Sequence, residues 1–294
     1  MKKDARELLE VIKSQVVLKE RDPHKLRQNF DKLYMSHPAT GPFKIQKEEE
    51  SPAPSYWIVT PESSQERVLL FFHGGLFNMG STHSHQDLCQ RLSQATGSSI
   101  FSVDYRLAPQ HPFPAALEDG LRSYLWLLEE GFRPQDVVLT GISAGGNLAL
   151  SILLALKGED ESLPQGAVGL SPILDLTFPV VYQHLKDVQD WIDYDNLHKL
   201  MASYLGGQNP ANFLLSPVYG DLEGLPPIFL QAGSCELLLC DVNRFRDLAI
   251  EQEVKVNLEV WQGMFHAWQM FPSILAEAEQ SLESVGEFVR DLKG

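Results

Sequence analysis

The chain has 294 residues, and its 24 Lys and Arg against 39 Asp and Glu give a formal net charge of −15 and a pI near 5.0. With 44% hydrophobic and 21% charged residues, it has the composition of a folded globular protein whose length allows two domains or one large α/β domain. Lys and Arg are scattered and outnumbered, which speaks against nucleic-acid binding and against binding to anionic membrane surfaces.

The amino-terminal segment predicts two amphipathic helices. Apolar residues recur at helical spacing within 3–20, and a second pattern restarts after Asp22-Pro23. The residues that carry the two patterns are Leu8, Leu9, Ile12, Val16 and Val17, then Leu26, Phe30, Leu33 and Tyr34. Residues 37–54 are rich in Pro, Gly and Glu and are predicted to be a connection. The charged start and the absence of any ~18-residue apolar run predict a cytoplasmic protein with no membrane span.

From Tyr56 onward, short apolar strands alternate with helices, as in βαβ units around a largely parallel sheet. Strands are predicted at 56–60, 68–72, 99–105, 137–140, 166–170, 228–231 and 255–260, and helices near 84–96, 114–130, 144–157, 241–252 and 273–292. Residues 175–215 interrupt this alternation and show near-helical apolar spacing from Trp191 to Tyr204, which predicts an inserted helical piece.

A G-x-S-x-G motif at residues 141–145 stands between the strand at 137–140 and the helix near 144–157. A serine exposed on so tight a bend brings the flanking positions against neighbouring backbone, so Gly141 and Gly145 must lack side chains. The helix that begins at Ala144 presents N–H groups and a dipole that favour an oxyanion beside Ser143. The motif therefore predicts a nucleophilic serine.

A second motif, His73-Gly74-Gly75, directly follows the strand that ends at Phe72. Two glycines after a strand let backbone N–H groups approach an acyl oxygen with no side chain in the way. We therefore predict an oxyanion hole formed by the N–H groups of Gly74, Gly75 and Ala144.

Several segments together resemble the hormone-sensitive-lipase family of α/β-hydrolases, and the resemblance spans nearly the whole chain. The matching blocks are His73-Gly74-Gly75-Leu76, Gly141 to Gly146, Asp104 through Ala116, and Gly263-Met264-Phe265-His266. The resemblance implies an α/β-hydrolase fold, with an eight-stranded, mostly parallel sheet flanked by helices and a helical cap. It places cap helices at 1–45 and the catalytic domain at 46–294, with a cap insertion at about 176–215.

A serine nucleophile needs a general base, and the base needs an acceptor that fixes its tautomer. His266 is the candidate base, because it follows a strand in a short loop and resembles the family's catalytic histidine. The acid is Glu236, which stands where the family's acid does, with Asp241 as the alternative that the spacing leaves open. Ser143, Glu236 and His266 then follow the α/β-hydrolase chain order of nucleophile, acid and base.

Two departures from the family pattern lie beside the predicted nucleophile. Leu76 replaces a third glycine and would narrow the pocket, and Ile142 replaces an Asp that precedes the serine in many relatives. Aromatic side chains near the site are candidates for the walls of the pocket, although ordinary core packing explains them equally well. The predicted substrate-binding residues are Leu76, Phe77, Ile142, Trp191, Phe265 and Trp268.

These residues predict a serine carboxylesterase that hydrolyses short- to medium-chain acyl esters through an acyl-enzyme. The open alternatives are a hydrolase of lactones or aryl amides and a receptor-like protein of the same fold that binds a small molecule. Some relatives of the receptor kind have lost the catalytic histidine, whereas His266 is present here. The expected partner is a small-molecule ester, and a homodimer stays open.

No cofactor and no metal are implied. The three cysteines lack a C-x-x-C pair, so neither a disulfide framework nor a cysteine zinc site is indicated. His83 and His85, with Asp87 nearby, have no third ligand at a motif spacing.

Overall fold

The computed structural model describes residues 1–15, 18, 20, 22–35, 41–178, 188–192 and 194–292. Val16 and Val17 of the first predicted helix lie outside the described residues, and so do 37–40 of the predicted connection and 179–187 of the predicted insertion. The boundaries predicted for the cap at 1–45 and 176–215 therefore stay predictions.

One eight-stranded sheet forms the centre of the molecule, in the order β1-β2-β4-β3-β5-β6-β7-β8. The strands are β1 (Lys44–Glu48), β2 (Ser55–Val59), β3 (Ser64–Phe72), β4 (Ser98–Val103), β5 (Val137–Ile142), β6 (Gly166–Leu170), β7 (Ile228–Gly233) and β8 (Val256–Trp261). The pairs from β4 through β8 are parallel, whereas β1 and β2 add antiparallel strands at one edge. Every residue of β5, β6 and β7 is buried, as expected of central strands covered on both faces. The predicted α/β-hydrolase architecture is confirmed.

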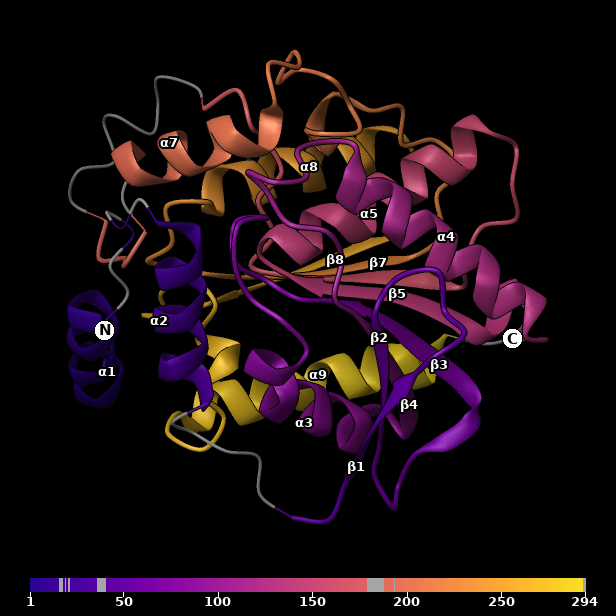
Figure 1. The fold of residues 1–294 in the computed structure, drawn as a ribbon, viewed down its shortest axis with the longest axis horizontal. Helices are drawn as coiled ribbons and strands as arrows, with labels where there is room; N and C mark the ends of the chain where they lie inside the picture. The colour runs from indigo at the N-terminus through magenta and orange to yellow at the C-terminus, as the bar shows by residue number, and fades with distance from the viewer. Residues whose placement is uncertain are drawn as a thin grey trace.

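Helices cover both faces of the sheet (Figure 1). On one side lie α3 (Gln86–Thr96) and α9 (Ala276–Asp291), which pack against each other. On the other side lie α4 (Ala115–Glu129), α5 (Ala144–Gly158) and α8 (Leu239–Glu251). The central helix α5 is buried along almost its whole length and contacts β3, β5 and β6. The turn that holds Ser143 therefore lies between a buried strand, β5, and a buried helix, α5.

Three further helices lie beyond one end of the sheet: α1 (Lys3–Gln15), α2 (Pro23–Met35) and α7 (Tyr194–Leu205) (Figure 1). The apolar residues that predicted α2 are its buried ones, namely Leu26, Phe30, Leu33 and Tyr34. The α2 helix packs on a short 3-10 turn at His83–His85, just before α3. These elements cover the end of the sheet at which Ser143 lies.

One strand was missed, because residues 44–48 were predicted as part of a loop. β1 is an edge strand with a single neighbour, and its residues are exposed or half-buried, with lysine at both Lys44 and Lys47. Such a strand shows no apolar alternation, since it has little core to face, and the charge keeps its free edge from pairing with other chains.

The Asp104 to Ala116 segment fastens the loop after β4 to α4. The Arg106 Nε donates to both carboxylate oxygens of Asp119, at 2.9 and 3.0 Å, and a terminal nitrogen donates to Glu118. Arg106 therefore has a structural role, because it joins this loop to α4.

Candidate active site

The turn between β5 and α5 holds Ser143 in a sharply bent conformation. Its φ of 56° and ψ of −116° lie outside the regions that most residues adopt, which is how a strained strand-to-helix turn exposes a side chain. The Ser143 N–H donates to the Leu170 carbonyl of the neighbouring strand at 2.8 Å, and its carbonyl accepts from Asn147 at 3.1 Å. The sheet and the helix together hold the nucleophile loop.

Glycine is required on both sides of Ser143, as predicted. A Cβ atom on Gly141 would lie 2.2 Å from the Gly145 carbonyl oxygen, and one on Gly145 would lie 1.9 Å from that of Phe72. Both distances are far below contact, and both neighbours are backbone that cannot rotate away. The close approach of β3, β5 and α5 therefore depends on these two positions.

Three side chains from separate loops meet in a line of hydrogen bonds. The Ser143 Oγ lies 2.8 Å from the His266 Nε2, and the His266 Nδ1 lies 3.2 Å from the Glu236 Oε2. All three side chains are buried. Because a carboxylate accepts at Nδ1, the proton of a neutral imidazole is held there, and Nε2 is left to accept from the serine.

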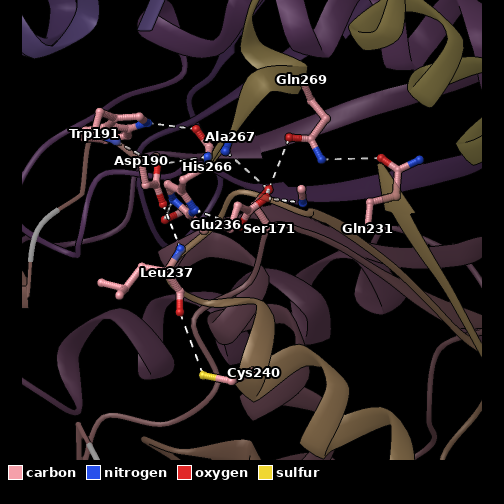
Figure 2. A network of polar contacts seen from close by, with 12 residues as sticks. Ser171, Asp190, Trp191, Gln231, Glu236, Leu237, Cys240, His266, Ala267 and Gln269 are labelled. Atoms are coloured by element: carbon pink, nitrogen blue, oxygen red, sulfur yellow. Dashed lines mark hydrogen bonds and ion pairs between the residues drawn. The ribbon is translucent and has the colours of Figure 1, made fainter. Parts of the chain in front are cut away.

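Glu236 is held in turn by donors on its second oxygen. Its Oε1 accepts from the Ser171 Oγ at 2.6 Å and from the Gly233 N–H at 2.6 Å. Burial raises the pKa of the Glu236 carboxyl, and the hydrogen bond from His266 opposes that rise. Figure 2 shows Ser171 and His266 beside the Glu236 carboxylate.

Asp241, the alternative acid, lies elsewhere. It is buried in the first turn of α8, where its Oδ1 accepts a weak hydrogen bond from the Cys240 thiol at 3.6 Å. The carboxylate at the His266 Nδ1 is that of Glu236.

One N–H group of the predicted oxyanion hole already has a partner within the protein. The Gly74 N–H donates to the His85 Nε2 at 3.0 Å. Burial lowers the pKa of His85 well below the usual histidine value, which keeps the imidazole neutral. Its Nδ1 faces the Ser81 carbonyl at 3.1 Å, an arrangement that leaves Nε2 as the acceptor.

Three other N–H groups are available at the serine. Among the residues that the structure describes, none accepts a hydrogen bond from the N–H of Gly75, Leu76 or Ala144. Gly75 and Leu76 line the same cavity as Ser143, and Ala144 opens α5, where the first N–H groups have no partner within the helix. These three N–H groups therefore have no acceptor among the described residues, unlike the Gly74 N–H.

Comparison with known proteins shows the family to which the chain belongs. Residues 69–270 match the family profile described as the alpha/beta hydrolase fold. The chain is 37% identical over 237 residues to an acetyl-hydrolase of Streptomyces hygroscopicus, covering 80% of this chain and 79% of that one. A crystal structure of an esterase from the bacterial hormone-sensitive lipase family superposes with a TM-score of 0.95 at 33% identity, over 100% of this chain and 99% of that one. The chain belongs to the hormone-sensitive-lipase family of α/β-hydrolases.

Two further relatives extend the comparison within the hormone-sensitive-lipase family. An esterase of Acinetobacter venetianus is 36% identical over 236 residues, covering 80% of this chain and 78% of that one. The esterase EstE5, in a crystal soaked by p-nitrophenyl butyrate, gives a TM-score of 0.93 at 31% identity, with 99% of each chain covered.

The two departures from the family pattern both border the nucleophile. Leu76 has a φ of 55°, in the left-handed region that glycine adopts without strain, which explains why relatives carry a third glycine there. Leu76 and Ile142 are both buried and both line the cavity over Ser143. They make the immediate surroundings of the serine apolar.

The cavity itself is small and mostly apolar. Its volume is about 20 Å³, and α2 supplies part of its wall through Phe30 and Tyr34. The remaining lining residues are Gly74, Gly75, Leu76, Met79, His85, Ile142, Ser143, Trp191, His266, Ala267 and Met270. Leu76, Ile142 and Trp191 were predicted for this pocket, whereas Phe30 and Tyr34 were predicted only as one face of an amphipathic helix.

Three aromatic residues predicted for the pocket do not line it. Phe77 stacks on Tyr204 at 3.7 Å between ring centres, and Phe265 packs against Phe271. Trp268 is fully buried beside Trp261. These three residues belong to the core. In a tight loop after a strand, neighbouring side chains point in different directions, so some face the core and others face the site.

His73 and His83 have other contacts. The His73 Nδ1 lies 2.8 Å from the Gly74 carbonyl oxygen and its ring stacks on Tyr105, so His73 braces the loop. The His83 ring lies edge-on to the Tyr56 ring. Over the described part of the chain, no three metal-binding side chains cluster, and no helix is long and apolar enough to cross a bilayer.

Sequence reasoning missed Asp190 altogether. This buried carboxylate accepts from the backbone N–H of His266 at 3.1 Å and of Leu237 at 3.0 Å, so it contacts the loops of both the base and the acid. It belongs to no short motif, and only the fold brings residue 190 to these loops.

Proposed function

We propose that the protein is a serine carboxylesterase that forms an acyl-enzyme on Ser143. The observation that carries the proposal is the continuous line of hydrogen bonds from Ser143 through His266 to Glu236. Membership of the hormone-sensitive-lipase family and the esterases among its relatives support the same reaction.

Each residue has a defined role in the proposed reaction. The His266 Nε2 takes the proton from Ser143 as its Oγ attacks the ester carbonyl, and Glu236 stabilises the imidazolium that forms. The N–H groups of Gly75, Leu76 and Ala144 stabilise the negative oxygen of the tetrahedral intermediate. His266 then gives its proton to the departing alcohol. In the second half, a water molecule attacks the acyl carbonyl while His266 takes one of its protons, and His266 gives that proton to the Ser143 Oγ as the carboxylic acid leaves.

The walls of the cavity favour small acyl groups. A volume of about 20 Å³ is roughly room for one water molecule, so Leu76, Phe30 and Tyr34 must yield even to an acetyl or butyryl chain. The acetyl-hydrolase name of one relative and the butyrate ester soaked into another relative's crystal point in the same direction. We therefore narrow the proposed substrates to short-chain esters.

Hydrolysis of p-nitrophenyl esters from acetate to palmitate tests the proposal, with Ser143→Ala as the control. We expect turnover that is greatest at the short end and is lost by at least about 10³-fold in the variant. Turnover that survives Ser143→Ala would overturn the proposal. Absence of turnover, together with saturable binding of an ester, would favour the receptor-like alternative.

The cytoplasmic location also stays a proposal, supported by three cysteines, Cys89, Cys235 and Cys240, that form no disulfide. The homodimer likewise remains a prediction.

A further inference from the structure

A buried carboxylate contacts the backbone of the candidate base. Asp190 is 8% exposed and is contributed by residues 188–192, far in sequence from the loops that it contacts. Its Oδ1 accepts from the His266 N–H at 3.1 Å, and its Oδ2 accepts from the Leu237 N–H at 3.0 Å. One side chain thus joins the loop of the base to the turn of the acid, as Figure 2 shows.

The next residue completes the arrangement. The Trp191 Nε1 donates to the His266 carbonyl oxygen at 2.8 Å, and its indole ring lies 5.6 Å from the imidazole between ring centres. Both backbone polar groups of His266 are therefore bound by two consecutive residues, Asp190 at the N–H and Trp191 at the carbonyl. Two such bonds fix the position and the rotation of the backbone from which the imidazole projects.

Asp190 is bound by N–H donors and has no cationic partner. Its Oδ1 also accepts from the Trp191 N–H at 2.8 Å, and no Lys or Arg of the described residues forms an ion pair with it. Burial raises its pKa, while the three N–H donors and His266 favour the ionised form. The titratable groups that act on it are His266 and Glu236. A negative charge here stabilises the positive imidazolium that forms during acyl transfer.

We propose that Asp190 is a positioning residue that holds His266 and the Glu236 turn in register, and that Trp191 completes this clamp. The proposal rests on the proposed function, because it concerns how the same base is kept at Ser143. Asp190 is then a second carboxylate beside Glu236. It acts through its bond to the His266 backbone N–H and through its negative charge, with no hydrogen bond to the imidazole.

Asp190→Asn tests the proposal on the whole chain, with steady-state kinetics on p-nitrophenyl acetate. Asparagine keeps the size but replaces one acceptor oxygen with a donor that faces an N–H group. We expect kcat to fall by about 10- to 100-fold with KM changed by less than about threefold, because the base is displaced while the pocket is kept. The acidic limb of the kcat/KM profile should move to lower pH, since the charge that favours imidazolium is gone.

Two further variants separate positioning from general damage. Trp191→Phe keeps the ring and removes the donor, and we expect kcat to fall by about fivefold with no movement of the acidic limb. Asp195→Asn makes the same charge change at an exposed position at the start of α7, and should leave kcat and the profile unchanged.

The outcomes distinguish this proposal from the proposed function. If the parent shows turnover that depends on Ser143 and Asp190→Asn matches the parent in kcat and pH profile, the role of Asp190 is refuted and the esterase assignment stands. A second outcome would also refute the positioning role of Asp190. In it, thermal unfolding shows that the loss of folded protein accounts for the whole fall in kcat, and the acidic limb does not move. Lack of Ser143-dependent turnover in the parent would instead refute the proposed function.

Discussion

The two halves of the candidate site are built differently. The nucleophile half is made by adjacent parts of the core: Ser143 lies between β5 and α5, and its N–H is held by the next strand, β6. The base half is made by loops that follow different strands, with His266 in one and Glu236 in the other. Asp190, from residues 188–192, accepts from the N–H of His266 and from the N–H of Leu237, the residue after Glu236.

This difference separates what local sequence can fix from what only the complete fold can fix. The bend at Ser143 follows from glycines two residues away on either side, whose neighbours approach to within 2.2 Å of a Cβ position. The distance from His266 to Ser143 depends on contacts between residues about 76 positions apart, such as the bond from the His266 N–H to Asp190. We therefore expect substitutions of the glycines that flank Ser143 to damage folding, and substitutions in the base half to damage turnover.

The largest effect should come from Gly145→Ala. Its added Cβ would lie 1.9 Å from the Phe72 carbonyl oxygen, so β3 and α5 must separate. We expect the free energy of unfolding to fall by about 3 kcal/mol or more, or the variant to be insoluble. Urea unfolding measures this, with Gly158→Ala in the same helix as the control. A Cβ there meets nothing within 4 Å, and that variant should gain about 0.5 to 1 kcal/mol. Equal stabilities of the two variants would contradict the account.

The next effect concerns the acid. Glu236→Gln keeps the shape and removes the charge at the His266 Nδ1, so we expect kcat to fall by about 10³-fold or more while the protein stays folded. Asp241→Asn is the matched change at the other candidate and should cost less than about tenfold. If Asp241→Asn proves the more damaging of the two, Glu236 is not the acid.

A smaller effect is expected at the oxyanion loop. His85→Leu removes the acceptor of the Gly74 N–H, which leaves a buried donor unpaired and frees Gly75 and Leu76 to shift. We expect kcat on p-nitrophenyl acetate to fall by about tenfold, with little change in KM. His83→Leu, in the same turn but exposed, is the control. Equal activities of the two variants would show that His85 does not support this loop.

The smallest effect is a pH dependence of stability in the base half. Burial raises the pKa of both Asp190 and Glu236. Between the ordinary and the raised value, the folded chain holds a proton that the unfolded chain has released, so the unfolding free energy falls as pH rises through that window. Asp190→Asn lacks one of these contributions, so its stability should improve relative to the parent from about pH 4 upward. Urea unfolding across that range checks this, and a constant difference between the two proteins would argue against it.

The sequence predicts the fold, and it predicts three residues, Ser143, His266 and Glu236, whose side chains the fold brings into hydrogen-bond contact. Particular positions show the physical reasons. The strand before Gly141 and the helix after Ser143 are strongly apolar, and the glycines around the serine allow the sharp turn between them. The motif and its surroundings therefore predict the same strand–turn–helix structure. The edge strand β1 escaped notice because it buries too little to need an apolar pattern.

The rest of the site depends on directions and long-range contacts that a sequence does not display. Gly74 and Leu76 are two positions apart in the same loop, and only the bond from the Gly74 N–H to His85 shows which N–H is left for substrate. Phe265 and Trp268 flank the base in sequence, yet both point into the core. Asp190 lies in a stretch without any motif, and its importance comes from two loops that fold against it.

The clamp on His266 also bears on how activity and folding are lost. Proteins open locally, in cooperative units that need less free energy than global unfolding. If residues 188–192 detach as such a unit, the His266 backbone loses both of its partners while the sheet and the Ser143 turn stay intact. Heat or mild denaturant would then abolish turnover in a chain that is still almost entirely native, and reversal would require only that this short segment dock again. For this enzyme, the midpoint of inactivation is expected to lie below the midpoint of unfolding.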